Sequence, residues 1–189
     1  PDKEQQSLRV KEFMNYQIMS EMKEYESEFD QMLFYLPLTG STFKKVYYDE
    51  MMQRTVSKFV PADDLVVPYT ATSLDDAETI IHVVKMSENE LRKQQVAGFY
   101  RDVELTPGQD NETDAQRKER ELDGMAKGRN QPMFTLLECH VNLDIEGFED
   151  TDTQGQATGI KLPYIVTVEE ASREVLSIRR NYEVGDVTR

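Results

Sequence analysis

The stretch LECHVNLDI, residues 137–145, decides the fold class of this chain. Apolar and polar residues alternate along it: Leu137, Cys139, Val141, Leu143 and Ile145 against Glu138, His140, Asn142 and Asp144. Because successive side chains of a strand point to opposite faces, this alternation predicts a half-buried antiparallel strand. The strand-like segments YIVTV (164–168) and VLSIRRNY (175–182) follow it, so residues 133–189 are predicted to form an antiparallel β-meander.

The N-terminal residues 1–36 show the period of a helix instead. Apolar residues recur there at steps of three and four: Val10, Met14, Ile18, Met22, Tyr25, Phe29, Met32 and Leu36. The pattern predicts one long amphipathic helix from about Lys3 to Leu36, roughly 50 Å long. A domain of this size does not cover such a helix on every side, so part of its stripe is expected to contact a neighbour. Ordinary core packing is the preferred interpretation of the stripe as a whole, and the candidate contact residues are Met14, Ile18, Met22, Tyr25 and Phe29.

Residues 37–105 are predicted to form a mixed α/β part that opens with a hairpin. Pro37 and Gly40 are expected to end the first helix at Leu36. Alternating residues over 43–48 and 55–60 predict the two strands of the hairpin. Lys44 and Lys45 point to opposite faces of its first strand, so they do not form a basic patch.

A strand and a capped helix are predicted next. Pro61 ends the hairpin, and Pro68 confines the short strand LVVPY (65–69) to an edge. TIIHVVKM (79–86) is apolar on both faces, as expected of a central strand covered on both sides. Ser87 and Glu90 then form a capping box for a helix that ends at Gly98.

Residues 106–132 are predicted to hold a polar loop and, over 114–129, an exposed helix with few apolar anchors. The fold class is therefore α+β, with a long N-terminal helix, a mainly antiparallel sheet with hairpins, and one or two further helices. We expect one globular unit. Because the chain starts at Pro1 and ends on a charged stretch, it is also expected to be a segment of a longer protein.

The charge balance disfavours polyanionic partners. The chain has 22 Lys+Arg against 36 Asp+Glu and a formal net charge of -14. A surface of this sign repels DNA and anionic lipid wherever its basic residues are not clustered. No apolar run approaches the roughly 20 residues that span a bilayer. We therefore expect neither sequence-specific DNA binding nor membrane association from these residues.

The chain offers little catalytic chemistry. Its single cysteine, Cys139, excludes an internal disulfide and a multi-cysteine zinc site. Cys139 and His140 are adjacent strand residues that point to opposite faces, which excludes a thiol–imidazole dyad. His82 lies within an apolar strand and is interpreted as a core residue with its hydrogen bonds satisfied. We predict no catalytic residue and no cofactor.

The best metal candidate is the segment FEDTDTQGQATG, residues 148–159. Asp150, Asp152 and Gly155 stand at positions one, three and six of a calcium loop. Position twelve is Lys161, where such a loop requires a bidentate glutamate, so a polar connector is the preferred interpretation and no metal is predicted. A metal-dependent hydrolase or nuclease that uses Glu149, Asp150 and Asp152 stays open as the alternative function.

Four stretches in order resemble the portal proteins of tailed bacteriophages, particularly those with short tails. They are LPLTGSTFKKVYYDE (36–50), RTVSKFVPADDLVVPY (54–69), ETIIHVVKMSENELRKQQVAGFYRDVEL (78–105) and TLLECHVNLDIEGFEDTDTQGQATGIKLPYIVTVEEASREVLSIRRNY (135–182). The resemblance implies the wing region of a subunit of a dodecameric ring at one capsid vertex. Such a ring serves DNA packaging, DNA ejection and tail attachment, and the family supplies no catalytic residues.

The resemblance also implies partners and a location. The partners are other portal subunits and, for the whole protein, capsid, terminase and tail proteins. The location is the virion, after assembly in the host cytoplasm. A head–tail adaptor module that is not a portal stays open as a second alternative, because ring formation by the parent protein is what separates the two.

Overall fold

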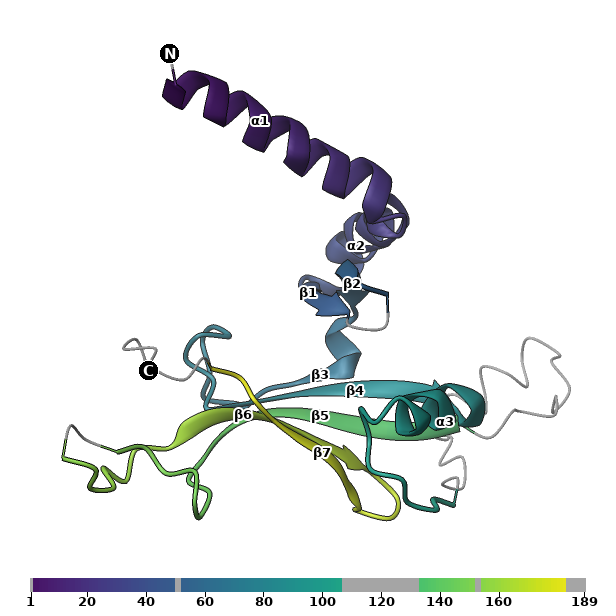
Figure 1. The fold of residues 1–189 in the computed structure, drawn as a ribbon. Coiled ribbons are helices and arrows are strands. Elements are labelled where there is room, and N and C mark those ends of the chain that lie inside the picture. Colours follow the sequence, from purple (N-terminus) through teal and green to yellow (C-terminus); the bar gives the residue numbers. More distant parts are fainter. Residues whose placement is uncertain (1, 50–51, 107–132, 152–153, 183–189) are drawn as a thin grey trace, which may run out of the picture. The chain divides into compact units, whose positions relative to one another are not determined.

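The computed structural model describes residues 2–49, 52–106, 133–151 and 154–182 (Figure 1). It confirms the predicted α+β class, with a helical N-terminus and antiparallel sheets. The chain divides into two compact units, Pro1–Leu65 (unit 1) and Val66–Arg189 (unit 2). The predicted exposed helix at 114–129 lies outside the described residues.

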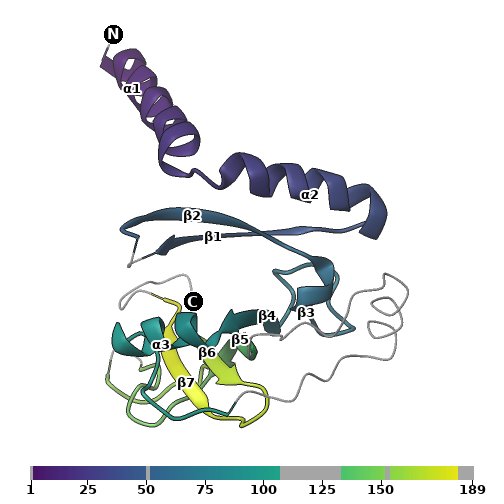
Figure 2. The same ribbon diagram turned by 90° about the vertical axis from the view of Figure 1, so that its right-hand side faces the viewer.

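Unit 1 consists of helices followed by a β-hairpin (Figure 2). In chain order its elements are α1 (Asp2–Tyr16), a π-helical turn η1 (Gln17–Glu21), α2 (Tyr25–Thr39), β1 (Phe43–Asp49), β2 (Arg54–Val60) and a 3-10 turn η2 (Ala62–Asp64). β1 and β2 pair antiparallel from Phe43 opposite Val60 to Asp49 opposite Arg54, which confirms the predicted hairpin. The first helical region and the hairpin thus belong to the same unit.

The predicted single helix from Lys3 to Leu36 is interrupted, which corrects that prediction. The N–H of Met22 donates to the carbonyl of Gln17 over 2.9 Å, five residues back rather than four. Met22 then leaves helical geometry at φ -85° and ψ 74°, and α2 begins at Tyr25. Residues 17–24 contain neither Gly nor Pro, so the local sequence does not mark this break. Glu24, the last residue of this segment, contacts residues outside the helix, as described below.

The predicted helix end at Leu36 is also wrong, because α2 continues to Thr39 with Pro37 in its last turn. A proline removes one i→i−4 hydrogen bond, a loss that a helix end tolerates better than a helix centre. Gly40 ends the helix instead: it adopts φ 79°, and its N–H donates to the carbonyl of Leu36 over 2.9 Å. A left-handed residue at this position is the usual way a helix closes.

Unit 2 is a five-stranded sheet with one helix. Its elements are β3 (Leu65–Val66), which starts at the last residue of unit 1, then β4 (Thr79–Ser87), α3 (Glu88–Val96), β5 (Met133–Leu143), β6 (Leu162–Glu169) and β7 (Val175–Arg180). The strand order is β3-β4-β5-β6-β7, and β4 to β7 pair antiparallel with their neighbours. The predicted edge strand and the predicted meander are both confirmed.

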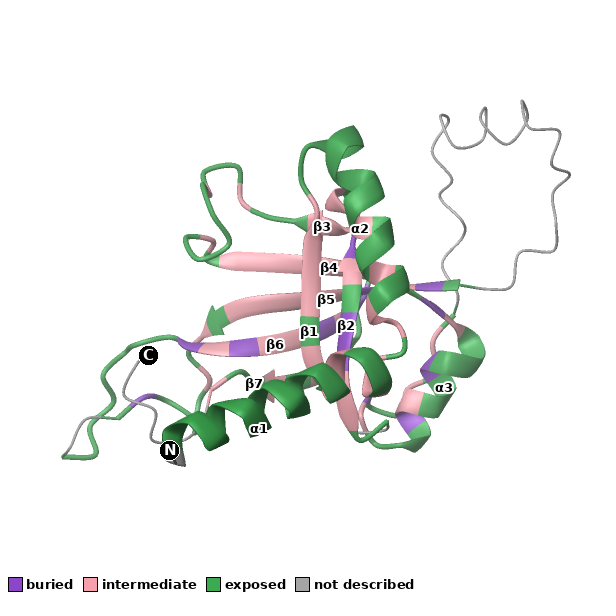
Figure 3. Ribbon diagram, turned by 90° about the horizontal axis from the view of Figure 1, so that it is seen from above, coloured by how far each residue is buried: buried purple, intermediate pink, exposed green. Residues whose placement is uncertain are grey.

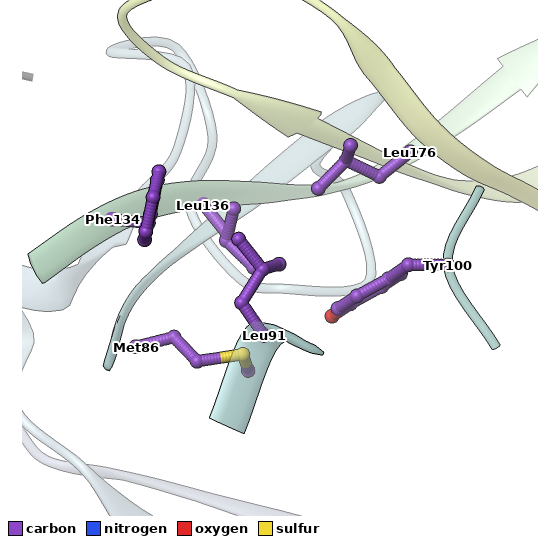
Figure 4. Packing of buried hydrophobic residues seen from close by; sticks show 6 residues of the cluster. All are labelled: Met86, Leu91, Tyr100, Phe134, Leu136 and Leu176. Atoms are coloured by element: carbon purple, nitrogen blue, oxygen red, sulfur yellow. The ribbon is translucent and has the colours of Figure 1, made fainter. Parts of the chain in front are cut away.

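The core of unit 2 lies where α3 packs against β4 and β5 (Figure 4). Its buried residues are Met86, Leu91, Tyr100, Phe134, Leu136 and Leu176. Ser87 caps α3 as predicted, since its Oγ accepts a hydrogen bond from the N–H of Glu90 over 3.3 Å. Residues 79–84 of β4 are half-buried, so the prediction that this strand is covered on both sides was wrong. The helix packs near the Met86 end of the strand, and burial is concentrated there.

Candidate functional site

Helix α1 presents apolar side chains to solvent from Leu8 to Tyr16. Every residue from Lys3 to Tyr16 is exposed (Figure 3). Leu8, Val10, Phe13, Met14 and Tyr16 are each more than half exposed. An isolated helix of about 15 residues is marginally stable in water, and most helices depend on packing of an apolar face. The candidate contact residue Met14 belongs to this uncovered set.

The other four candidate contact residues lie elsewhere in unit 1. Ile18 and Met22 are half-buried at the interruption between α1 and α2. Tyr25 and Phe29 lie on α2 and stack on one another, with ring centroids 5.9 Å apart and an interplanar angle of 9°. The Nζ of Lys44 lies 3.8 Å from the Tyr25 centroid and 5.1 Å from that of Phe29. These two rings therefore form a cation–π contact with the hairpin inside the unit.

Two carboxylates at the start of α2, those of the N-cap Glu24 and of Glu28, bind the backbone of the neighbouring strand β2. Oε1 of Glu24 accepts a hydrogen bond from the N–H of Ser57 over 3.4 Å, and Oε2 of Glu28 accepts one from the N–H of Phe59 over 2.7 Å. Glu24 and Glu28 are four residues apart, which is about 6 Å along a helix, and Ser57 and Phe59 are two residues apart, which is about 6.6 Å along a strand. The spacing of the carboxylates therefore matches the spacing of the N–H groups that they bind. The carboxylates thereby occupy N–H groups of a strand edge, which would otherwise be open to pairing with another strand.

Glu24 also forms an ion pair that holds the start of α2. Its Oε1 lies 2.8 Å from Nη1 of Arg54, with the two side chains 18% and 25% exposed. The hydrogen bond from Arg54 is the main reason that the pKa of Glu24 is lowered, and the backbone N–H of Ser57 contributes. We call the group Glu24, Glu28, Arg54 and the N–H groups of Ser57 and Phe59 the α2–β2 clamp. Tyr35 and Phe59 stack beside it, with centroids 5.5 Å apart.

The Asp150 loop closes on itself through hydrogen bonds. Asp150 is buried, and its Oδ2 accepts from the Oγ1 of Thr158 over 2.7 Å. Its backbone carbonyl accepts from the N–H of Thr158 over 2.8 Å. Within the described ranges, no group of three or more His, Cys, Asp or Glu side chains is arranged to hold a metal ion. Asp152 lies outside those ranges.

The third residue of the alternative metal site, Glu149, also has partners within the loop. Backbone hydrogen bonds from Glu149 itself and from Gly147 lower the pKa of this carboxylate. The bond from the Gly147 N–H to Oε2 measures 3.0 Å. Glu149 and Asp150 therefore both support the loop conformation.

The register of the sheet places Cys139 and His140 on opposite faces. Cys139 lies opposite Ile81 on β4 and Val166 on β6, among aliphatic side chains. Burial is the main cause that raises the pKa of its thiol, and the charge of Glu138 adds to it. The thiol is thus held protonated at neutral pH, which does not suit a nucleophile. His140 instead lies with its Nε2 3.1 Å from Oε1 of Glu138.

A row of polar residues crosses the face of the sheet that carries His140. His82, Glu138, Thr167 and Ser177 lie directly opposite one another on four successive strands. Thr167 is 1% exposed, and within the described part of the chain neither its Oγ1 nor the Oγ of Ser177 has a hydrogen-bond partner. The sequence showed each polar position, but the row becomes visible only when the strand register is known. It lies next to the core under α3 rather than in an open site.

Among the described residues, no helix is long and apolar enough to cross a membrane. A protein-family model described as phage SU10 portal protein matches residues 1–152. The match includes all of unit 1 and reaches through β5 of unit 2, so the chain belongs to this family of phage portal proteins. The predicted family resemblance is confirmed. Comparison with curated proteins gave no match.

Proposed function

We propose that the chain is a structural, non-enzymatic segment of a portal protein and forms part of a ring at one vertex of the capsid. In that place it serves DNA packaging, DNA ejection and tail attachment. The observation that carries the proposal, beside the family match, is helix α1 with its exposed apolar side chains. The segment corresponds to the wing of such a subunit.

The subunit contact is assigned first to α1. Leu8, Phe13 and Met14 are more than half exposed on a helix too short to be stable alone. In a closed ring each subunit contacts its neighbour through two different surfaces, so an uncovered helix is the kind of element that such a heterologous interface uses. Ile18 and Met22, half-buried at the interruption, would continue the same interface.

The charge of the chain suits a ring through which DNA slides. A net charge of -14 keeps affinity for phosphate low, because affinity rises with each phosphate that Lys or Arg neutralises. No cofactor is needed for this role. The proposed partners are other portal subunits and, for the parent protein, capsid, terminase and tail proteins.

The alternative of a metal-dependent nuclease finds no support in the described part of the Asp150 loop. Asp150 is buried and bound to Thr158, and Glu149 accepts backbone hydrogen bonds. The adaptor alternative differs from the portal in the assembly that the parent protein forms. Ring formation therefore decides between these two structural roles.

The contact role of α1 is tested with a charged double variant of the parent protein. Phe13→Glu with Met14→Glu is expected to abolish or strongly reduce ring formation, because it places two charges in the proposed interface. Gln5→Glu with Gln6→Glu adds the same charge to exposed positions of the same helix and serves as the control. Size-exclusion chromatography with light scattering and negative-stain images report the assembly. Rings of normal yield from the first variant would overturn the role of α1.

A further inference from the structure

The sequence and the structure of residues 17–24 favour different conformations. Apolar residues keep helical spacing across this segment, with steps of four from Met14 to Ile18 and Met22 and a step of three to Tyr25. The segment QIMSEMKE consists mostly of good helix formers and contains no Gly or Pro. Local preference therefore favours a continuous helix. The structure instead shows a π-turn and a non-helical Met22 at this place.

The contacts that favour the bent conformation over a continuous helix come from outside the helix. Glu24 is the last residue of this segment and stands immediately before the first residue of α2. It binds Arg54 and the N–H of Ser57 on β2, and one turn later Glu28 binds the N–H of Phe59. These bonds fix where α2 begins and how it lies along the hairpin. They also fix the point from which α1 departs in another direction (Figure 2).

The charges around the clamp favour its closed form. Arg54 is the cation of the group, and Asp49 and Glu21 add negative charge beside it. Hydrogen bonds to charged groups contribute more than neutral ones, and the two carboxylates make three such bonds with β2. Removing the carboxylate charges would leave the helical preference of residues 17–24 unopposed.

We infer that residues 17–24 are a conformational switch: the α2–β2 clamp holds the bent form, and its release allows α1 and α2 to join into one continuous helix from Asp2 to Thr39. The switch reorients the exposed apolar residues of α1. π-turns within helices occur frequently at functional sites, and the hinges of switching transitions are a few residues in loops or at the ends of elements. The inference does not depend on ring formation.

The test is a distance measured along the helices. Cysteines introduced by Gln6→Cys and Gln31→Cys, with Cys139→Ser, carry spin labels at two exposed positions. In a continuous helix their Cα atoms would be about 38 Å apart. The unchanged clamp is expected to give a shorter distance. Adding Glu24→Gln and Glu28→Gln is expected to shift the distribution towards the continuous-helix value, and Glu26→Gln, on the same helix, is expected to leave it unchanged.

A second variant and a second measurement distinguish release of the clamp from a folding defect. Arg54→Met removes the cation but keeps an apolar stem, and it is expected to lengthen the distance in the same direction. Hydrogen exchange at the amides of Ser57 and Phe59 is expected to accelerate at least tenfold in the variants, while exchange in β5 is unchanged. If both clamp variants keep the distance of the unchanged protein, or if their segment 17–24 melts without lengthening, the inference is overturned.

Discussion

The two units of the chain are stabilised by different means. Unit 2 has an apolar cluster in which Leu136, Phe134 and Leu176 are each at most 2% exposed. In unit 1, the buried residues within the described range are Val56, Ser57 and Val60, all on β2, while α1 is exposed from Lys3 to Tyr16. Its α2 is held by carboxylates, an ion pair and stacked rings. One unit has a core of its own, and the other depends on polar and aromatic contacts at a hairpin.

This difference indicates which unit is expected to change conformation or contacts. Burial of apolar surface is strong and insensitive to charge, whereas ion pairs and charge-assisted bonds respond to pH, salt and neighbours. Regions that move or bind partners are drawn from the less stable parts of a fold. Unit 1 is therefore the expected site of assembly and rearrangement, and unit 2 the expected scaffold.

The largest effect is expected in the core of unit 2. Leu136→Ala should lower the free energy of unfolding by about 3 kcal/mol, because it removes a buried side chain and leaves a cavity. This free energy is measured by urea denaturation, with hydrogen exchange of the β5 amides as the readout. Val96→Ala is the control, since Val96 is 77% exposed and its truncation should change stability by less than about 0.5 kcal/mol. Equal effects of the two variants would remove the contrast between core and surface.

An intermediate effect is expected at the clamp of unit 1. Glu28→Ala should destabilise unit 1 by about 1–2 kcal/mol, because the N–H of Phe59 loses a charged acceptor at 2.7 Å. Hydrogen exchange resolved by segment should show the loss in β2 and not in β5. Glu26→Ala changes an exposed carboxylate on the same helix and should have little effect. A loss of the same size from both variants would mean that the contact with β2 is not what matters.

The smallest effect is the pH dependence of the Glu24–Arg54 pair. The pKa of Glu24 is lower in the folded protein than in the unfolded chain. Its stabilisation is therefore complete above the unfolded pKa of about 4.3 and is lost as the pH falls through the folded pKa. The unfolding free energy of Glu24→Gln should lie less than about 1 kcal/mol below that of the unchanged protein at pH 7, and this gap should close towards pH 3. A gap that widens in acid would contradict the assignment of the ion pair.

Much of the fold was predictable from local patterns. The hairpin, the capped helix α3 and the meander follow from alternation, from Ser87 and from Gly98, each of which acts within a few residues. The interruption at residues 17–24 was not predictable, because the contacts beside it come from Arg54 and the backbone of β2, which lie 30 or more residues further along the chain. The sequence predicted the end of α2 at Leu36, before Pro37, although Gly40 closes the helix. A proline in the last turn of a helix removes one hydrogen bond without ending the helix.

The candidate surfaces were predictable in part. The apolar period of the helix identified Met14, which is exposed. The same period also included Tyr25 and Phe29, which contact Lys44 within the unit, and did not distinguish them from Met14. A helical stripe does not show which of its residues its own chain covers. The polar row through His82 and Glu138 was missed for a related reason, since strand register is set by pairing along the whole strands.

The most direct test of the proposed role is negative-stain electron microscopy of the parent protein. We predict rings with a central channel, whose yield depends on Phe13 and Met14 of α1. Monodisperse particles without rings under assembly conditions would contradict the proposed portal role, and the structural account would then rest on the fold and the family match alone.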